Sequence, residues 1–390
     1  MHRPIRVLAI AAIVSASLLL SASTVLAAGP TRSAWTRVVG HVYVDANSAG
    51  RNAIAGFDRH ADGSLTPIPG SPFDAGGVGT GTPTGSAGAI QRTDDGRYLV
   101  AVDAGSDQLS VLRIRRDGSL RLVDLVASNG HKPVSVTIHH DLVYVANAGA
   151  GGSDYTGFRL DAGGRLHPIP RSTVPLPDDA MPGQVLFSAD GRTLVGMRVG
   201  PSAGPSFIDS FRVGSLGRLT PAAGSPYPAQ RIGPFGSAFS PAHPDELFVS
   251  NAHDGPGAGS VSVYHVGRHS RLTAIPGSPF ADGQTAPCWV AISPDGRHLF
   301  AINTAVPSIT SYGIGHGGRL TLLGSTPFAD PTGLAPFDAA LDPLGRFLYV
   351  VDAGTAQVSA FAVDGGGLSE LPGSPSSIPS GGAPFGIVVD

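Results

Sequence analysis

The residues best suited to chemistry in this sequence are a carboxylate, Asp338, a guanidinium, Arg198, and an amide, Gln184. Together these groups offer the charges and hydrogen bonds that hold a polar ligand. Aligning the strands of an internal repeat on their Pro residues places Gln184, Trp289 and Asp338 in one column. Ser135 lies in the same column, and Arg198 ends a neighbouring strand. We therefore predict one site for a polar ligand, with Trp289 as an apolar or stacking wall.

Arg198 also has a structural interpretation. Its guanidinium could be neutralised by Asp338, or by a carboxylate of a nearby loop such as Asp178 or Asp179. Both interpretations stand at the level of sequence. A ligand site requires Arg198, Gln184 and Asp338 to converge in an accessible pocket, whereas the structural interpretation requires a neutralised Arg198 and a filled mouth.

Other polar residues give weaker signals. His131, His253 and Asp254 lie in loops on the same predicted face and are possible ligand-binding residues. The G-x-S-x-G match at residues 200–204 lacks the strand-to-helix turn that a nucleophilic Ser needs. Cys288 is the single Cys, which excludes a CxxCH haem site, and no acidic calcium loop is present. We predict neither a metal nor a cofactor.

The candidate positions recur because the chain is built from a repeat. The segment VAISPDGRHLFAIN at residues 290–303 has counterparts in VLFSADGRTLVGMR at 185–198 and AALDPLGRFLYVVD at 339–352. Each unit has four apolar or alternating runs separated by turn signals, which is typical of a four-stranded propeller blade. A Gly-x-Leu-type turn recurs at Leu65, Leu120, Leu166, Leu219, Leu272, Leu320 and Leu368. These turns predict an all-β, seven-bladed β-propeller of four-stranded blades.

The two ends of the repeat region complement each other. Residues 41–47, HVYVDAN, have a second-strand pattern, and residues 383–390, APFGIVVD, have a first-strand pattern. We therefore expect the C-terminal strand to complete the N-terminal blade and close the ring. The spacing allows the second strand of this blade to end at either Asp45 or Asn47.

The loops indicate which face carries a site. In an antiparallel blade, the start of strand one and the end of strand two share a face. The loops on that face are long, at residues 74–88, 172–181, 199–207 and 252–259, whereas the opposite face carries tight turns. Because binding residues concentrate on long loops of rigid scaffolds, we place the site at the long-loop mouth of the central channel.

Composition limits the partners. Charged residues make up 14 % of the chain and the formal net charge is -3, so a basic face for nucleic acid is not expected. A small lactone or carbohydrate suits the predicted site, and we expect a monomer.

The N-terminus carries an export signal. Arg3 and Arg6 precede an apolar run, and small residues precede Ala28, as in a secretory signal peptide. We predict a signal peptide at 1–27, a linker at 28–39 and a single propeller domain at 40–390. The protein is then secreted, to the extracellular space or the cell envelope, without stable membrane insertion after cleavage; an uncleaved anchor is the alternative.

The repeated pattern PxG...SPDGRxLYVxN...VSxFxV...GxLxxLPGSPF resembles the seven-bladed lactonase family, with its 6-phosphogluconolactonase-like and carboxymuconate-cyclase-like members and the related YVTN-type repeats. The resemblance implies a propeller whose channel holds Arg, His and Glu. The matching positions in this chain are Gly183 for Arg and Gln184 for His, and no Glu follows Arg198. The chain's two Glu residues, Glu246 and Glu370, are expected in a far-face turn and an outermost strand.

Because the chain lacks the family's Arg, His and Glu at these positions, we consider two functions. The first is a metal-independent hydrolase of a small polar lactone, in which Asp338 is the base and Arg198 and Gln184 stabilise the oxyanion. The second is a non-catalytic extracellular binding or scaffold propeller that recognises a glycan, peptide or protein at its long-loop face.

Overall fold

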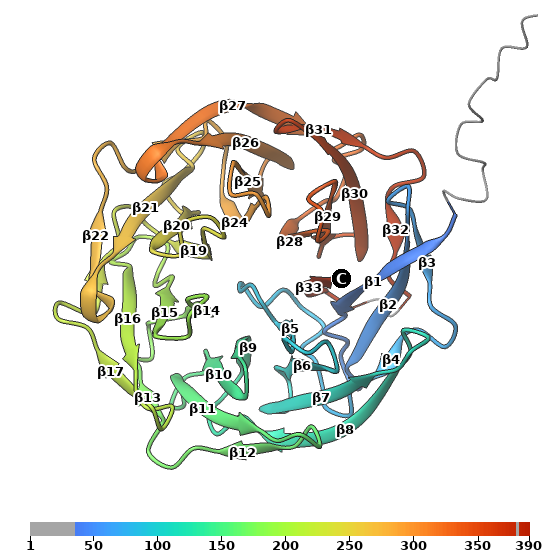
Figure 1. Cartoon of the computed structure of the whole chain (residues 1–390), viewed down its shortest axis with the longest axis horizontal. Coiled ribbons are helices and arrows are strands. Elements are labelled where there is room, and N and C mark those ends of the chain that lie inside the picture. Colours follow the sequence, from blue (N-terminus) through green and yellow to red (C-terminus); the bar gives the residue numbers. More distant parts are fainter. Residues whose placement is uncertain (1–35, 380–381) are drawn as a thin grey trace, which may run out of the picture.

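The computed structural model describes residues 36–379 and 382–390. Within them, the strands form seven antiparallel sheets arranged as blades around a central axis (Figure 1). This arrangement confirms the predicted seven-bladed β-propeller. The signal peptide lies outside the described residues, as does the linker up to residue 35, and the first strand begins at Val38. No helix in the described part of the chain is long and apolar enough to cross a membrane.

Each blade begins with its innermost strand at the axis and continues outwards. Blade one contains β33 (Phe385–Val389), β1 (Val38–Asp45), β2 (Ala53–His60), β3 (Leu65–Pro67) and β4 (Phe73–Asp74). Blade two contains β5 (Ile90–Arg92), β6 (Tyr98–Asp103), β7 (Gln108–Ile114) and β8 (Leu120–Ala127). Blade three contains β9 (Pro133–His139), β10 (Leu142–Asn147), β11 (Asp154–Leu160), β12 (Leu166–Pro168) and β13 (Val174–Pro175). Blade four contains β14 (Pro182–Phe187), β15 (Thr193–Arg198), β16 (Phe207–Val213), β17 (Leu219–Pro221) and β18 (Tyr227–Pro228).

The remaining three blades follow the same order. Blade five contains β19 (Pro234–Phe239), β20 (Glu246–Asn251), β21 (Ser260–Val266), β22 (Leu272–Ala274), β23 (Phe280–Ala281) and the 3-10 turn η1 (Arg268–Ser270). Blade six contains β24 (Pro287–Ile292), β25 (His298–Asn303), β26 (Ser308–Ile314), β27 (Leu320–Pro327) and the 3-10 turn η2 (His316–Gly318). Blade seven contains β28 (Pro336–Leu341), β29 (Phe347–Asp352), β30 (Gln357–Asp364), β31 (Gly367–Glu370) and β32 (Ser376–Ser377). Where two short strands follow the third, both pair with it and share the outermost place.

The ring closes in blade one. There β33 pairs antiparallel with β1, and Val42 lies opposite Val389. The two strands lie side by side in Figure 1, although they come from opposite ends of the repeat region. The strand β1 ends at Asp45, which decides between the two predicted ends, and Asn47 has another role described below. Closure gives β1 a strand partner on its inner side, as the sequence predicted.

The repeated SPDG segment is a structural hairpin. In blade six, Gly296 has a φ of +70°, which glycine adopts readily. The Ser293 hydroxyl donates to Asp295 Oδ1 at 2.5 Å, and Asp295 Oδ1 accepts the Arg297 N–H at 3.0 Å. The polar groups of these residues form hydrogen bonds with one another within the turn. The motif therefore shapes the blade and does not form a site.

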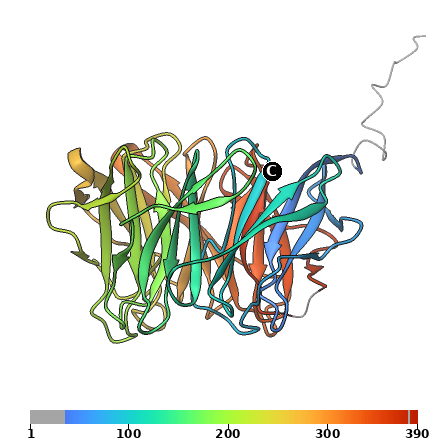
Figure 2. The ribbon, with the colours of Figure 1, turned by 90° about the horizontal axis from the view of Figure 1, so that it is seen from below.

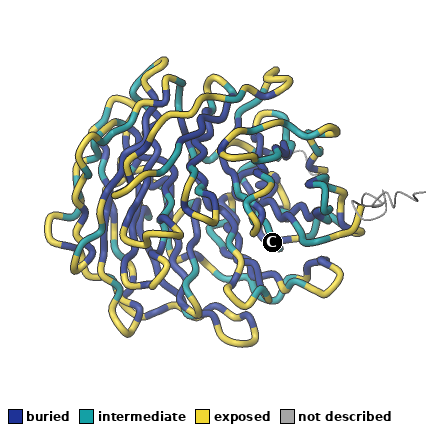
Figure 3. Tube along the Cα trace, turned by 45° about the horizontal axis from the view of Figure 1, so that its top comes forward, coloured by how far each residue is buried: buried dark blue, intermediate teal, exposed yellow. Residues whose placement is uncertain are grey.

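Packing between blades supplies the core. Each apolar cluster joins neighbouring blades: Val111 of blade two packs with Phe158 of blade three, and Phe57 of blade one packs with Tyr349 of blade seven. Figure 3 shows buried residues along the strands and exposed ones in the turns. Figure 2 shows the strands running between the two faces of a flattened ring. Any recess is therefore expected at the axis or between blade edges.

Tyrosines add polar links between blades. A tyrosine hydroxyl of the second strand donates to a carbonyl in the outer turn of the next blade. The pairs are Tyr43 with Gly118 at 2.8 Å, Tyr144 with Gly217 at 2.7 Å and Tyr349 with Gly63 at 2.9 Å. Each link satisfies a buried hydroxyl and fixes the position of one blade against the next.

Candidate functional site

The four residues of the predicted column lie near the start of the innermost strand of their blades. In the strand register, Gln184 lies opposite Met197, Trp289 opposite Ile302 and Asp338 opposite Val351, and Ser135 occupies the same place in blade three. Each partner is the residue that precedes the last residue of the second strand. The four side chains therefore belong to one level near the axis, as the sequence predicted.

A loop of the protein itself occupies this level. The segment before β5 reaches the middle of the ring (Figure 1), where the Ala87 N–H donates to the Gly183 carbonyl at 2.9 Å. The Gly88 carbonyl accepts the Val136 N–H at 2.9 Å. Ser86 and Ala87 are buried at 1 % and 0 % exposure. Residues 84–88, which we call the axial loop, thus connect blade two to blades three and four across the mouth.

Asn47 bonds Thr80 and Thr82, which immediately precede the axial loop in the connection from blade one to blade two. Its Oδ1 accepts the Thr80 N–H at 2.7 Å, and its Nδ2 donates to the Thr82 carbonyl and to the Ala383 carbonyl. These contacts tie the connection to blade one before it enters the mouth.

Asp338 lies under the axial loop. Its Oδ2 accepts the Gly88 N–H at 3.0 Å, and the backbone N–H groups of Ala339 and Gly386 also stabilise the carboxylate. The residue is 1 % exposed. Burial raises the pKa of Asp338 to about 7, although these hydrogen bonds act in the opposite direction. Asp338 is a buried carboxyl near its midpoint at neutral pH, and Gly88 covers it.

The polar side-chain atoms of Gln184 and Trp289 all form hydrogen bonds within the protein. Gln184 Oε1 accepts the Ser237 N–H at 2.6 Å and the Ser237 hydroxyl at 2.8 Å, while its Nε2 donates to the Ser237 carbonyl. Trp289 Nε1 donates to the Ala339 carbonyl at 2.8 Å. Gln184 thus clamps blade four to blade five, and Trp289 links blade six to blade seven. The Ser135 hydroxyl likewise has a partner within the chain, since it accepts the Val185 N–H at 3.1 Å.

Arg198 pairs with Asp209 of β16, its neighbouring strand. Its Nε and Nη2 donate to the two carboxylate oxygens at 2.5 and 2.7 Å, a bidentate arrangement. The Tyr155 hydroxyl adds a third hydrogen bond to Asp209 at 3.1 Å. The side chains of Arg198 and Asp209 are 14 % and 2 % exposed. Burial raises the pKa of Asp209, and Arg198 and Tyr155 partly offset this.

This partner corrects the predicted one. The sequence suggested Asp338, Asp178 or Asp179, but Asp178 instead accepts the Gly151 N–H at 2.8 Å. The register explains the true partner, because Gly196 lies opposite Asp209 and has no side chain. The space above Gly196 admits the Tyr155 hydroxyl, which lies within 2.1 Å of where a Cβ would be. The sequence could have indicated the Arg198–Asp209 pair, because it has a Gly in the second strand opposite an Asp in the third.

The same register position is polar in other blades. The last residue of the second strand bonds a side chain two places along the third strand, as in Asn251 with Ser262 and Asn303 with Thr310, both at 2.9 Å. Arg198 and Asp209 take these places in blade four. Arg198 is therefore the charged counterpart of a structural asparagine. Arg198, Gln184 and Asp338 thus each bond a different partner within the chain: Asp209, Ser237 and Gly88.

His131 lies in a cleft of about 630 Å³ on the long-loop face, between blades two and three. Its Nδ1 lies 2.9 Å from Asp107 Oδ2, and Asp107 Oδ1 accepts the Lys132 N–H. Asp154 and Asp178 also line the cleft. Burial raises the pKa of Asp154, which accepts hydrogen bonds from Asn147 and Thr156. The cleft offers several hydrogen-bond acceptors and an exposed imidazole.

His253 and Asp254 lie on the same face near blade five. Asp254 Oδ1 accepts the Ile232 N–H at 3.2 Å and lines a smaller recess of about 350 Å³. Burial lowers the pKa of His253, while Asp254 acts to raise it. His253 Nδ1 and Asp254 Oδ2 are both buried without a hydrogen-bond partner. These two residues are neighbours, but His131 belongs to a different cleft.

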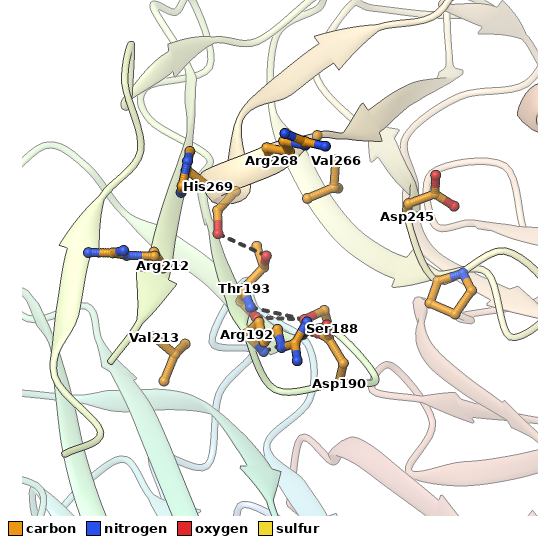
Figure 4. A pocket seen from close by; sticks show the side chains of 13 residues that line it. Ser188, Asp190, Arg192, Thr193, Arg212, Val213, Asp245, Val266, Arg268 and His269 are labelled. Atoms are coloured by element: carbon orange, nitrogen blue, oxygen red, sulfur yellow. Dashed lines mark hydrogen bonds and ion pairs between the residues drawn. The ribbon is translucent and has the colours of Figure 1, made fainter. Parts of the chain in front are cut away.

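Sequence reasoning missed the larger recess on the other face. A cleft of about 840 Å³ lies between the turns of blades four and five (Figure 4). We expected only tight turns there. One signal was present: the outer turn of blade five reads GRHSRL and has Ser270 where the other blades have Gly. Among the described residues, no three His, Cys, Asp or Glu side chains are grouped as metal ligands.

The repeat has a recognised family. A family model described as "Lactonase, 7-bladed beta-propeller" matches residues 44–180 and 242–384. The chain belongs to the seven-bladed lactonase family. The two matched segments leave out residues 181–241. This stretch contains Gly183 and Gln184, where the family's Arg and His were expected, and Arg198, after which its Glu was expected. A search of curated proteins finds no match.

Solved structures similar to this lactonase-family propeller share its fold. A candidate 6-phosphogluconolactonase from Bacteroides uniformis has a TM-score of 0.72 and 19 % identity, covering 91 % of this chain and 100 % of its own. A periplasmic gluconolactonase from Pseudomonas aeruginosa has a TM-score of 0.68 and 20 % identity, covering 90 % and 98 %. Hydrazine synthase from Kuenenia stuttgartiensis has a TM-score of 0.58 and 18 % identity, covering 80 % and 89 %. Such different names on one fold mean that the residues of the site must decide function.

Proposed function

We propose that this lactonase-family propeller is a non-catalytic binding protein that acts outside the cytoplasm and recognises a hydroxyl-rich ligand such as a glycan. One observation carries the proposal: the three side chains that lactone opening would require already have partners within the chain. Arg198 is held by Asp209, Gln184 by Ser237, and Asp338 by Gly88. A hydrolase needs a free base and free donors for the developing oxyanion.

The cleft around His131 is the ligand site that this proposal favours on the long-loop face. Its carboxylates accept hydrogen bonds from hydroxyl groups, and its position between loops leaves it open to large ligands. The Asp107 carboxylate orients the His131 ring through Nδ1, which leaves Nε2 for a ligand. Export of the mature chain is part of the proposal, since a glycan ligand of this kind would be met at the cell surface.

Lactone hydrolysis at the axis is the second candidate, and the pKa of Asp338 favours it. A carboxyl with a pKa near neutrality is suited to general-base catalysis. This candidate requires the axial loop to leave Asp338 and requires other groups to stabilise the oxyanion. Membership of the seven-bladed lactonase family also supports this candidate.

The test measures binding and turnover on the same purified protein. We expect neutral oligosaccharides from a glycan panel to bind, His131→Ala to weaken that binding, and Asp338→Asn to leave it unchanged. We expect no turnover of sugar or muconate-type lactones above buffer. Lactone turnover that Asp338→Asn abolishes in folded protein would replace the proposal with the hydrolase. Glycan binding that is insensitive to His131→Ala would remove the site from this cleft.

A further inference from the structure

The hairpin of β7 and β8 at the outer edge of blade two carries a concentration of positive charge (Figure 1). Residues 113–121 read RIRRDGSLR, with four arginines and one aspartate, in a chain whose formal net charge is -3. All four arginines are exposed. The aspartate, Asp117, accepts hydrogen bonds from the N–H and the hydroxyl of Ser119 within the turn. The end of this hairpin is therefore a locally basic surface, on the face of the ring that carries the tight turns.

Two of these arginines lie directly opposite each other. Arg113 of β7 and Arg121 of β8 are partners in the antiparallel register, so both side chains leave the same face of the blade. The Cβ atoms of such partners lie about 4.5 to 5.5 Å apart, which is less than the length of an arginine side chain. Both guanidinium groups can therefore contact a single anion. Like charges at this spacing repel each other and destabilise the sheet unless an opposite charge joins them.

Blade three shows how a cationic pair at the same positions is neutralised. Its register places Arg159 opposite His167. The Arg159 guanidinium donates to Asp141 at 2.7 Å, and His167 Nε2 lies 3.0 Å from Asp161 Oδ2. Asp141 directly precedes β10, and Asp161 directly follows β11. Each positive side chain of this pair thus has its own carboxylate.

Blade two has arginines where blade three has these aspartates. Arg97 directly precedes β6, and Arg115 directly follows β7. Arg97 has an exposed carboxylate beside it, with its Nη1 3.6 Å from Asp95 Oδ2. Within the described residues, the side chains of Arg113 and Arg121 make no ion pair or hydrogen bond. Two neighbouring guanidinium groups are therefore left without a counter-ion.

This arrangement favours a tetrahedral oxyanion over a carboxylate. One arginine binds a carboxylate through two parallel hydrogen bonds, which use both of its oxygens. A sulfate or phosphate ester has three terminal oxygens, so it can accept hydrogen bonds from two guanidinium groups at once. The exposed Arg115 and Arg116 continue the positive surface beyond the pair. A polymer that carries such groups at intervals can place one at the pair and others at these neighbours.

We infer that this hairpin surface binds a sulfated polysaccharide, with one sulfate group held between Arg113 and Arg121. The surface lies on the tight-turn face and the His131 cleft on the long-loop face, so the inference goes beyond the proposed function. Only the choice of a polysaccharide among polyanions rests on that proposal, because sulfated polysaccharides are met outside the cytoplasm. Salt screens attraction between exposed charges, so binding should weaken as the ionic strength rises.

The test is calorimetric titration of the purified protein at physiological ionic strength. The probe is a heparin-derived hexasaccharide, compared with a hyaluronan hexasaccharide, which carries carboxylates without sulfates, and with an oligoglutamate peptide. We expect saturable binding of the heparin hexasaccharide at about 0.1 mM or below, and binding of the other two that is weaker by about tenfold or more. The variant Arg113→Gln with Arg121→Gln should weaken binding of the heparin hexasaccharide by about tenfold or more.

Blades four and five supply a matched control. Arg212 has the same register as Arg113, opposite the first residue of the second strand, but its partner in the outer strand is Thr220. Arg268 is exposed in the outer turn of blade five. The variant Arg212→Gln with Arg268→Gln removes the same charge, and we expect binding of the heparin hexasaccharide to change by no more than about twofold.

A thermal melt tests whether the pair has a structural role instead. Removing one arginine relieves the repulsion between like charges, so Arg121→Gln should melt at or above the wild-type temperature when no polysaccharide is present. The heparin hexasaccharide should raise the melting temperature of the wild type more than that of the double variant Arg113→Gln with Arg121→Gln.

Five results would overturn the inference: no saturable binding of the heparin hexasaccharide, equal affinity for the hyaluronan hexasaccharide, equal or tighter binding of oligoglutamate, equal effects of the two double variants, or a lower melting temperature of Arg121→Gln. The proposed function would be judged separately, since His131→Ala is expected to leave binding of the heparin hexasaccharide unchanged.

Discussion

Replacing Arg198 distinguishes a ligand residue from a structural one. In Arg198→Ala, Asp209 loses both charge-assisted hydrogen bonds and keeps the Tyr155 hydroxyl. Because the Asp209 side chain is 2 % exposed, the variant leaves a buried carboxylate without a counter-ion. Breaking a buried pair from one side costs about 3 to 5 kcal/mol. Arg198 is partly exposed, so we expect the lower end, about 3 kcal/mol.

The assay is urea unfolding at pH 7, followed by fluorescence. We expect the midpoint to fall while the slope stays unchanged, since the folded and unfolded surfaces are unaltered. A second substitution, Asp209→Asn, should restore part of the loss because it removes the unpaired charge. The matched control is Arg192→Ala, whose exposed pair with Asp190 should be worth less than about 1 kcal/mol.

The pH dependence of the deficit adds an independent test. Burial already raises the pKa of Asp209, and loss of Arg198 would raise this pKa further. A carboxyl whose folded pKa exceeds its unfolded value is most favourable to folding at low pH. The deficit of Arg198→Ala should therefore shrink as the pH falls towards 5. A variant as stable as the wild type at pH 7 would refute the structural role and return Arg198 to the list of ligand residues.

Three further perturbations probe the axis. Asp338→Asn should remove a pH-dependent loss of stability, because the folded pKa of Asp338, about 7, exceeds the unfolded value of 3.8. The wild type should therefore lose about 3 kcal/mol relative to the variant between pH 4 and 7, as measured by unfolding at each pH. Gly88→Ala should destabilise by about 1 kcal/mol in thermal melts, because φ is +74° and a Cβ would lie 3.3 Å from the Ser135 hydroxyl; an unchanged melt would argue that the axial loop is loose. Cys288, whose pKa burial raises to about 12, should resist a thiol reagent at pH 8 until urea unfolds the protein, and rapid labelling of native protein would contradict that burial.

The sequence by itself determined the architecture of this protein. Strand period, SPDG hairpins and Gly-x-Leu turns are local signals, so seven copies were enough to predict seven blades. The end segments, 41–47 and 383–390, even predicted the closing strand pair, because each carried the pattern of one specific strand. The column of Gln184, Trp289 and Asp338 followed from the same local alignment.

Only the tertiary structure decided what the column residues contact. Gly88 reaches Asp338 across 250 positions of sequence, and Gln184 bonds Ser237 of the next blade. Such contacts depend on how blades face one another and on where a Gly-rich loop runs, which the strand period does not encode. Arg198 is the intermediate case, since its partner lies in the adjacent strand at a register shared with other blades. The cleft between blades four and five arises in the same way, between separately encoded turns.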